Sequence, residues 1–414
     1  MPESGLPAEL GAAYLSEVLT PSQREDYERD GFLVLRGRFG DAEISSFERA
    51  YLRQPPHSVM PAGRSYPEPG RYTLAHSCMA DPDLAAIAEH PEVLSPVRDL
   101  LGDDPLLTAF VVYDRTPDGP GLPKHNDYKR WRPVGSSMHW LFTIVPFTDY
   151  DEEIGPLFVS PGSHRLDRVR DRGERALHVD PAVVPSDDSF IDPELARGDL
   201  LLMNMHMWHK AGPNRSKRAR AGFFNKYAAK NHPPATGYYV YSDAAHAALS
   251  PDGQRIIAVH SDRSVSHTRM LLERQGRDGP EFLCLRDDTG RITLPGGPTW
   301  REEAIPDWDY GNYIASLHDS MRKQLRVETP WATYVGDYVE GTELTRVYAY
   351  PLNDLGFPVP YPGEWLSADD LRGEPPGKLG LGYLPRALED WQAPGIVRGK
   401  GVSQAQARID QYAY

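Results

Sequence analysis

The 414-residue chain has few of the features that mark secreted or membrane-spanning proteins. It contains only two cysteines, Cys78 and Cys284, so at most one disulfide can form, and a chain of this length does not depend on one crosslink. The N-terminus has no basic region and no apolar run of signal-peptide length. No apolar stretch reaches the roughly 18 residues that predict a transmembrane helix. These absences favour a cytoplasmic protein.

The chain also lacks an excess of positive charge. Its 45 lysines and arginines are outnumbered by 59 aspartates and glutamates, which gives a net charge of −14. No basic stripe offers neutralisation of phosphates, so neither a nucleic acid nor a membrane is an expected partner. The apolar content of 40% is adequate for a large core, and the length suits one large domain or two ordinary ones.

Two histidines and one aspartate have the pattern of a metal site. His125 and Asp127 are two residues apart, and such positions of an extended strand project to the same face. His209 completes the set of two histidines and one carboxylate that non-heme Fe(II) oxygenases use, a set that leaves coordination positions open for a co-substrate and dioxygen. By itself the H-x-D tripeptide also fits a solvated surface loop, which is its commoner setting.

Arg220, eleven residues after His209, is a candidate anion-binding residue, because its planar guanidinium can hold a carboxylate through two hydrogen bonds. Arg218 is the alternative, since residues two apart on a strand share a face. His206 competes with His209 as a ligand, but on a strand their odd spacing places them on opposite faces. His139 lies inside an apolar run and is interpreted as a core or pocket-wall residue.

Motifs on both sides of the H-x-D tripeptide follow one another in a specific order and spacing. They are a helix and strand at residues 19–36, the run from His125 to Trp131, Gly155-Pro156-Leu157, Pro161-Gly162-Ser163-His164, the run from Gly198 to Leu202, and the run from Trp208 to Ser216. From about Leu19 to about Tyr227 the chain therefore resembles the phytanoyl-CoA dioxygenase-like branch of the Fe(II)/2-oxoglutarate oxygenases.

This resemblance implies a fold and a set of ligands. The fold is mainly β with flanking helices: a double-stranded β-helix, or jelly roll, which the short strands broken by Gly and Pro also fit. His125, Asp127 and His209 would bind Fe(II), and Arg220 would bind the distal carboxylate of 2-oxoglutarate, with O2 as the second co-substrate. The family offset favours His209 over His206 and Arg220 over Arg218.

Aromatic residues and departures from the family pattern refine this site. Trp131 matches a family aromatic near the pocket, and Phe142 is a candidate wall of the co-substrate site, although either residue also fits a plain core role. Ala211 replaces a serine whose hydroxyl helps to hold the co-substrate in relatives, and Ile154 replaces an asparagine, which we interpret as a change in turn chemistry. Related halogenases carry a small residue at the position of Asp127, so hydroxylation is favoured over halogenation.

The expected reaction is hydroxylation of an unactivated C–H bond of a small metabolite, with release of succinate and CO2. Natural-product tailoring is one setting for such a reaction. The same residues also fit desaturation, epimerisation or cyclisation, and a jelly roll also serves as a non-catalytic binding module. A homodimer is left open.

The predicted organisation has three parts: a leader at 1–18, the jelly-roll core at 19–233, and an extension at 234–414 that packs on the core or covers the pocket. An irregular loop is expected at 54–75, and a hairpin at 281–294. Helices are expected at 21–30, 41–53 and 309–325, with one or two helices within 82–101, and strands at 32–35, 107–113, 138–147, 157–159, 199–208 and 219–228.

Overall fold

A computed structural model describes residues 19–54, 72–127, 139–169, 184–230, 238–299, 310–326, 332–352 and 363–393 of the chain. The predicted leader, Trp131 and the boundary near residue 233 lie outside these residues. None of the helices within these ranges is both long and apolar enough to cross a membrane. Cys78 and Cys284 are both buried and are not joined by a disulfide.

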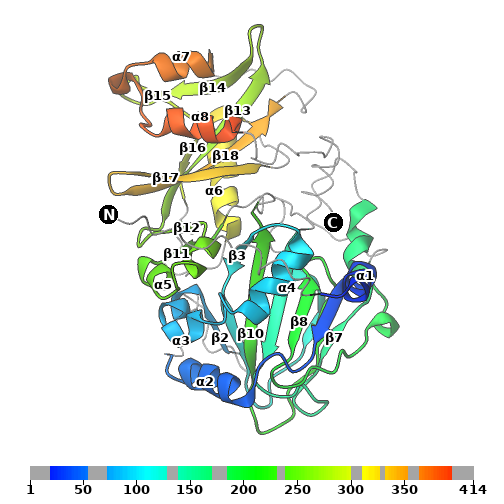
Figure 1. Cartoon of the computed structure of the whole chain (residues 1–414). Helices are drawn as coiled ribbons and strands as arrows, with labels where there is room; N and C mark the ends of the chain where they lie inside the picture. Colours follow the sequence, from blue (N-terminus) through cyan, green and yellow to red (C-terminus); the bar gives the residue numbers. More distant parts are fainter. Residues whose placement is uncertain are drawn as a thin grey trace, which may run out of the picture.

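The N-terminal half contains two antiparallel sheets, arranged as the jelly roll that was predicted (Figure 1). The larger sheet has the order β1 (Phe32–Leu35), β8 (Leu200–Asn204), β6 (Trp140–Pro146), β10 (Arg220–Ala229), β4 (Val111–Arg115) and β2 (Tyr72–Ala75), and β3 (Pro105–Ala109) also pairs with β10. The smaller sheet has the order β5 (Leu122–His125), β9 (His209–Ala211) and β7 (Leu157–Val159).

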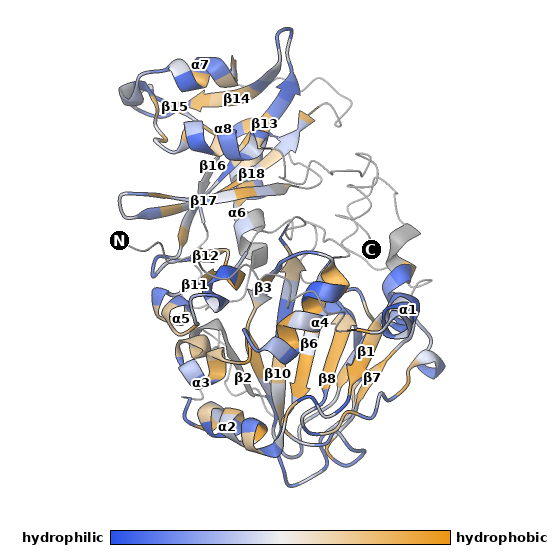
Figure 2. Ribbon diagram, in the orientation of Figure 1, coloured by the Kyte–Doolittle hydropathy of each residue, from blue (hydrophilic) through white to orange (hydrophobic). Residues whose placement is uncertain are grey.

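Strand β6 shows why the large sheet is buried on both faces. All seven of its residues are buried, and Figure 2 shows the barrel strands as a largely apolar region. Leu141 and Val145 belong to the cluster shared with the helices, whereas Phe142 and Ile144 belong to a second cluster inside the barrel. This alternation follows from the two-residue period of a strand, so a continuous apolar run supplies both layers.

Helices cover the outer face of the large sheet. They are α1 (Pro21–Asp30), α2 (Asp41–Leu52), α3 (Pro82–Ala85) and α4 (Pro91–Leu101). Helix α1 begins at a capping box formed by Thr20 and Gln23, and ends at Gly31, whose φ of 82° suits glycine. A side chain at Gly31 would also collide with the ring of His164. The absence of a side chain at Gly31 therefore lets the Pro-Gly-Ser-His turn pack closely against this helix end.

Some predicted elements differ in the structure. The single strand expected at 107–113 is split at Phe110 into β3 and β4, which pair with opposite ends of β10. The strand expected at 199–208 ends at Asn204, because residues 205–208 turn before β9 begins. Residues 72–75, expected to be part of a loop, form β2. The strand predicted at 219–228 is confirmed as β10.

Another sheet lies in the C-terminal half (Figure 1), next to α5 (Asp243–Ala247) and the short parallel pair β11 (Val240–Tyr241) and β12 (Val259–His260). Its central strand is β13 (Val265–Gln275), which pairs in parallel with β18 (Glu343–Pro351). The other strands are β14 (Pro280–Arg286), β15 (Ile292–Thr293), β16 (Gly296–Pro298), β17 (Thr333–Glu340) and β19 (Glu364–Ser367); the helices are α6 (Tyr310–Leu325), α7 (Ala368–Gly373) and α8 (Leu384–Gln392). The predicted hairpin, β14–β15, and the predicted helix, α6, are confirmed.

A buried contact joins the C-terminal sheet to the barrel. Leu106 of β3 and Tyr238 share a hydrophobic cluster with residues of the C-terminal sheet. Arg346 of β18 donates a hydrogen bond to the Tyr238 carbonyl and also pairs with Asp337, and both charged side chains are fully buried. The division of the chain at 1–18, 19–233 and 234–414 remains a proposal.

Candidate metal centre

The small sheet brings the two predicted histidine ligands together. His125 is the last residue of β5 and His209 the first residue of β9, and they are directly paired in the antiparallel register. The register shifts by one residue between Leu122 and His125, so a bulge in β5 sets this pairing. Directly paired residues project to the same face, and the two imidazole ring centroids lie 4.3 Å apart.

Asp127 reaches the same point although it lies just beyond the strand. Its Oδ1 lies 3.5 Å from Nε2 of His125 and 4.0 Å from Nε2 of His209. The three ligand atoms all lie within 4.8 Å of one another. Adjacent octahedral ligands at ~2.1 Å from an ion are about 3 Å apart, so a small closure of this triangle is enough to seat a metal ion.

Backbone carbonyls orient both imidazoles. Nδ1 of His125 lies 2.7 Å from the Pro123 carbonyl, and Nδ1 of His209 lies 3.1 Å from the Met207 carbonyl. Because a carbonyl only accepts, each Nδ1 carries the proton and each Nε2 keeps a lone pair toward Asp127. Burial, and then the neighbouring His125, lower the pKa of His209 to about 4, so this imidazole is neutral at pH 7.

Asp127 is ionised in spite of its surroundings. Burial alone would raise the pKa of its carboxyl. The ammonium group of Lys226, and after it the two neighbouring histidines, instead hold that pKa well below its usual value. Two imidazole nitrogens and one carboxylate oxygen therefore face a common point, which is the donor set of the facial triad.

Arg220 lies at the start of β10 and is almost completely buried, with 2% of its surface exposed. Its guanidinium carbon lies 4.4 Å from the ring centroid of Tyr150, and Nη1 donates to the Gly155 carbonyl. Burial lowers its pKa from the ordinary range. Among the residues that the structure describes, Nε of Arg220 has no hydrogen-bond partner. An N–H of a buried cation is therefore available for an acceptor.

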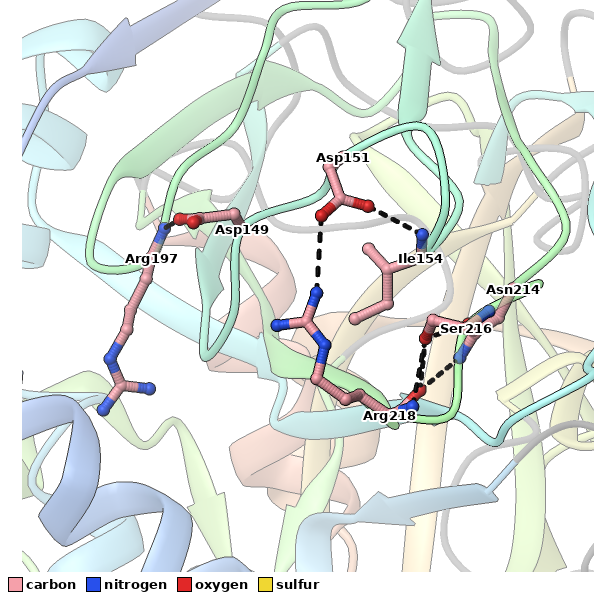
Figure 3. Close-up of polar contacts among 7 residues, drawn as sticks. All are labelled: Asp149, Asp151, Ile154, Arg197, Asn214, Ser216 and Arg218. Atoms are coloured by element: carbon pink, nitrogen blue, oxygen red, sulfur yellow. Dashed lines mark hydrogen bonds and ion pairs between the residues drawn. The ribbon is translucent and has the colours of Figure 1, made fainter.

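Arg218 does not share this environment. The expectation that Arg218 and Arg220 lie on one strand face is wrong, because β10 begins only at Arg220. Arg218 lies in the preceding turn, and its side chain pairs with the exposed Asp151 over 3.4 Å (Figure 3). The buried Asn214 and Ser216 both donate hydrogen bonds to the Arg218 carbonyl, and this network fixes the chain as it enters β10.

The remaining predicted residues have different outcomes. Phe142 is buried beside the triad, with its ring centroid 6.2 Å from that of His209. Trp131 lies outside the described residues. Ala211 lies in β9, two residues after His209. The backbone N–H of Ile154 donates to the side chain of Asp151, so an aspartate three residues earlier provides the turn acceptor (Figure 3).

The competing histidines lie elsewhere. His206 is buried in the turn between β8 and β9. The expectation that His206 and His209 lie on opposite faces of one strand is therefore wrong, because the strand ends at Asn204. His139 is exposed and directly precedes β6, so its interpretation as a core or pocket-wall residue is wrong, because the buried strand begins at Trp140.

Sequence reasoning missed two cations of this site. Nζ of Lys226 lies 3.5 Å from Oδ2 of Asp127. Lys226 is six residues after Arg220, and an even spacing on a strand places both side chains on the same face. This spacing could have indicated Lys226 from the sequence. Arg115, which is 1% exposed, pairs directly with Arg220 across the β4–β10 register. That pairing depends on a long-range register, which no local pattern reveals.

Comparison with known proteins shows which family the barrel resembles. The family model for phytanoyl-CoA dioxygenase (PhyH) matches residues 27–222. An ectoine dioxygenase from Bordetella bronchiseptica is 29% identical over 38% of this chain and 54% of its own length. The peroxisomal phytanoyl-CoA dioxygenase of Bos taurus is 26% identical over 36% of this chain and 49% of its own length. The chain thus spans about half the length of these curated relatives.

Among solved structures, EctD from S. alaskensis, crystallised with 2-oxoglutarate and 5-hydroxyectoine, aligns with a TM-score of 0.43 and 20% identity, over 52% of this chain and 78% of that one. The family match covers both strands of the small sheet that carry the histidines, together with Arg220. The barrel region of this chain is therefore similar to the phytanoyl-CoA dioxygenase (PhyH) family.

Proposed function

We propose that this protein is a non-heme Fe(II)/2-oxoglutarate-dependent dioxygenase that hydroxylates an unactivated C–H bond of a small metabolite. The observation that carries the proposal is the convergence of His125, Asp127 and His209 in one barrel with the buried Arg220. The matched relatives named as dioxygenases support the same class.

The donor set fits iron(II). Two Nε2 lone pairs and one carboxylate oxygen are borderline and hard donors, and a set of three leaves positions free for exogenous ligands. Iron held by His125, Asp127 and His209 would supply the redox chemistry that couples decarboxylation of 2-oxoglutarate to oxidation of a substrate by O2. Pro123 and Met207 contribute through their carbonyls, because these hold the imidazoles in the ligating tautomer.

The protein binds and orients the co-substrate in this proposal. Arg220 pairs with the distal carboxylate of 2-oxoglutarate, because a buried guanidinium offers charge-assisted hydrogen bonds where water does not compete. The ring of Tyr150 lies against the guanidinium, and the Gly155 carbonyl accepts a hydrogen bond from one of its nitrogens, so the side chain is positioned before a ligand enters. Phe142 forms an apolar wall beside His209, and Trp131 is proposed as a second aromatic contact.

The reaction outcome follows from how a substrate lies against this site. Hydroxylation is our first proposal, and natural-product tailoring its setting. Desaturation, epimerisation and cyclisation would use the same residues, because they differ in substrate pose rather than in ligand set. In this proposal the extension at 234–414 packs on the jelly-roll core at 19–233, through contacts such as the hydrophobic cluster that Leu106 shares with Tyr238.

The test measures succinate formed from 2-oxoglutarate by purified protein supplied with Fe(II) and O2. The wild-type protein should release succinate even without its substrate, through uncoupled turnover. His209→Ala should abolish this release, whereas His139→Ala should leave it unchanged, because His139 is an exposed histidine of the same barrel. Succinate release that survives His209→Ala would contradict the metal assignment, and a wild-type protein that binds metal without turnover would indicate a non-catalytic binding module.

A further inference from the structure

A buried lysine contacts the carboxylate of the candidate metal centre. Lys226 lies in β10 and is paired with Phe142 of β6 in the antiparallel register. Its Nζ lies 4.3 Å from the ring centroid of Phe142 and 3.5 Å from Oδ2 of Asp127, and only 10% of its side chain is exposed. A lysine buried to this degree is uncommon unless its charge is paired.

The two oxygens of Asp127 have different partners. Oδ1 faces the imidazoles, at 3.5 Å from Nε2 of His125 and 4.0 Å from Nε2 of His209. Oδ2 faces Lys226. The ammonium group therefore lies on the side of the carboxylate that does not face the histidines, where it attracts the second oxygen.

This division matters because a carboxylate can bind a metal ion through one oxygen or through both. A facial triad needs one oxygen only, since a second would occupy a coordination position needed by the co-substrate or dioxygen. A fixed cation on the second oxygen favours that choice, because rotation of the carboxylate toward a two-oxygen mode would separate a largely buried ion pair.

We propose that Lys226 is a positioning residue that restricts Asp127 to binding the metal through a single oxygen. This inference rests on the metal centre of the proposed function and deepens it. Lys226 acts through Asp127 and through its own placement against Phe142, whose ring contact limits the conformations of the lysine side chain.

The test uses Mn(II) as the probe, with the metal-free full chain. Bound Mn(II) enhances the relaxation of water protons in proportion to the number of waters that it holds. A triad with a one-oxygen carboxylate leaves three such positions and a two-oxygen carboxylate leaves two. Lys226→Met should therefore reduce the enhancement per bound ion to about two-thirds of the wild-type value. Lys226→Arg, which keeps a cation, should stay near the wild-type value.

Lys230→Met is the matched control, because Lys230 directly follows β10 and is exposed. It should match the wild type. Circular dichroism checks that each variant folds, and Lys226→Gln replaces Lys226→Met, with the same expectation, if the latter does not. An unchanged enhancement per bound ion in the folded variant would overturn the inference while leaving the metal centre intact. Failure of the wild-type protein to bind Mn(II) would instead overturn the metal centre on which the inference rests.

Discussion

Replacement of Arg220 by glutamine is the sharpest test of the co-substrate site. The guanidinium is buried, stacks on Tyr150 and keeps Nε without a hydrogen-bond partner among the described residues. If this group binds the distal carboxylate of 2-oxoglutarate, Arg220→Gln removes one partner of a buried charge pair. The ligand carboxylate then enters a buried site without its counter-charge.

The magnitude follows from that burial. Truncating one partner of a buried, hydrogen-bonded charge pair costs about 2–5 kcal/mol of binding free energy. A loss of about 3 kcal/mol weakens the affinity for 2-oxoglutarate roughly 150-fold. Arg218→Gln is a closely matched control, two residues away. Arg218 pairs with Asp151 at the surface, where 58% and 47% of the two side chains are exposed, so its loss should leave the affinity within about twofold of the wild type.

Each Fe(II)-loaded variant is titrated anaerobically with 2-oxoglutarate. Binding is measured by calorimetry or by the visible absorption of an iron-bound 2-oxo acid. Metal affinity is measured separately with Mn(II), and should be similar in both variants, because neither arginine contacts the triad in the described structure. The proposed role of Arg220 would be refuted if Arg220→Gln left the affinity for 2-oxoglutarate unchanged, or if Arg218→Gln weakened that affinity more.

Two further predictions concern stability. Burial lowers the pKa of His209 to about 4 from its ordinary value of 6.5, so between these values the folded metal-free chain binds fewer protons than the unfolded chain. Its free energy of unfolding should therefore fall by up to about 3 kcal/mol as the pH drops from 6.5 to 4. Denaturant titrations should show a smaller fall in His209→Asn. An equal fall in both proteins would contradict the lowered pKa of His209. Asp337→Asn should destabilise the protein by about 3–5 kcal/mol because it leaves Arg346 buried without its counter-charge. The double variant Asp337→Leu/Arg346→Met should lose less, and a double variant that is less stable than Asp337→Asn would refute this reasoning.

Much of the barrel could be predicted from the sequence, because its signals are local. The apolar run at 140–146 supplies two core layers through the two-residue period of a strand, and the structure confirms it as β6. The first helix, expected at 21–30, is confirmed, and it begins at the Thr20–Gln23 capping box and ends at Gly31. Side-chain chemistry and the order and spacing of the surrounding motifs together selected His125, Asp127 and His209 as candidate ligands.

Other features depend on contacts between segments that are far apart in the chain. The bulge in β5 sets His125 opposite His209, and the end of β8 at Asn204 decides that His206 lies in a turn. The parallel pairing of β13 with β18 joins residues more than seventy positions apart, and no local pattern encodes it.

The sequence by itself determined which side chains can bind a metal and which strands are buried, because donor chemistry and apolar periodicity belong to individual residues and their near neighbours. Only the tertiary structure decided how Asp127 is held. The ammonium of Lys226 reaches it from β10, and Arg115 lies opposite Arg220 across the sheet. The physical reason is that charge pairing inside a protein depends on distance and burial, and strand register sets both.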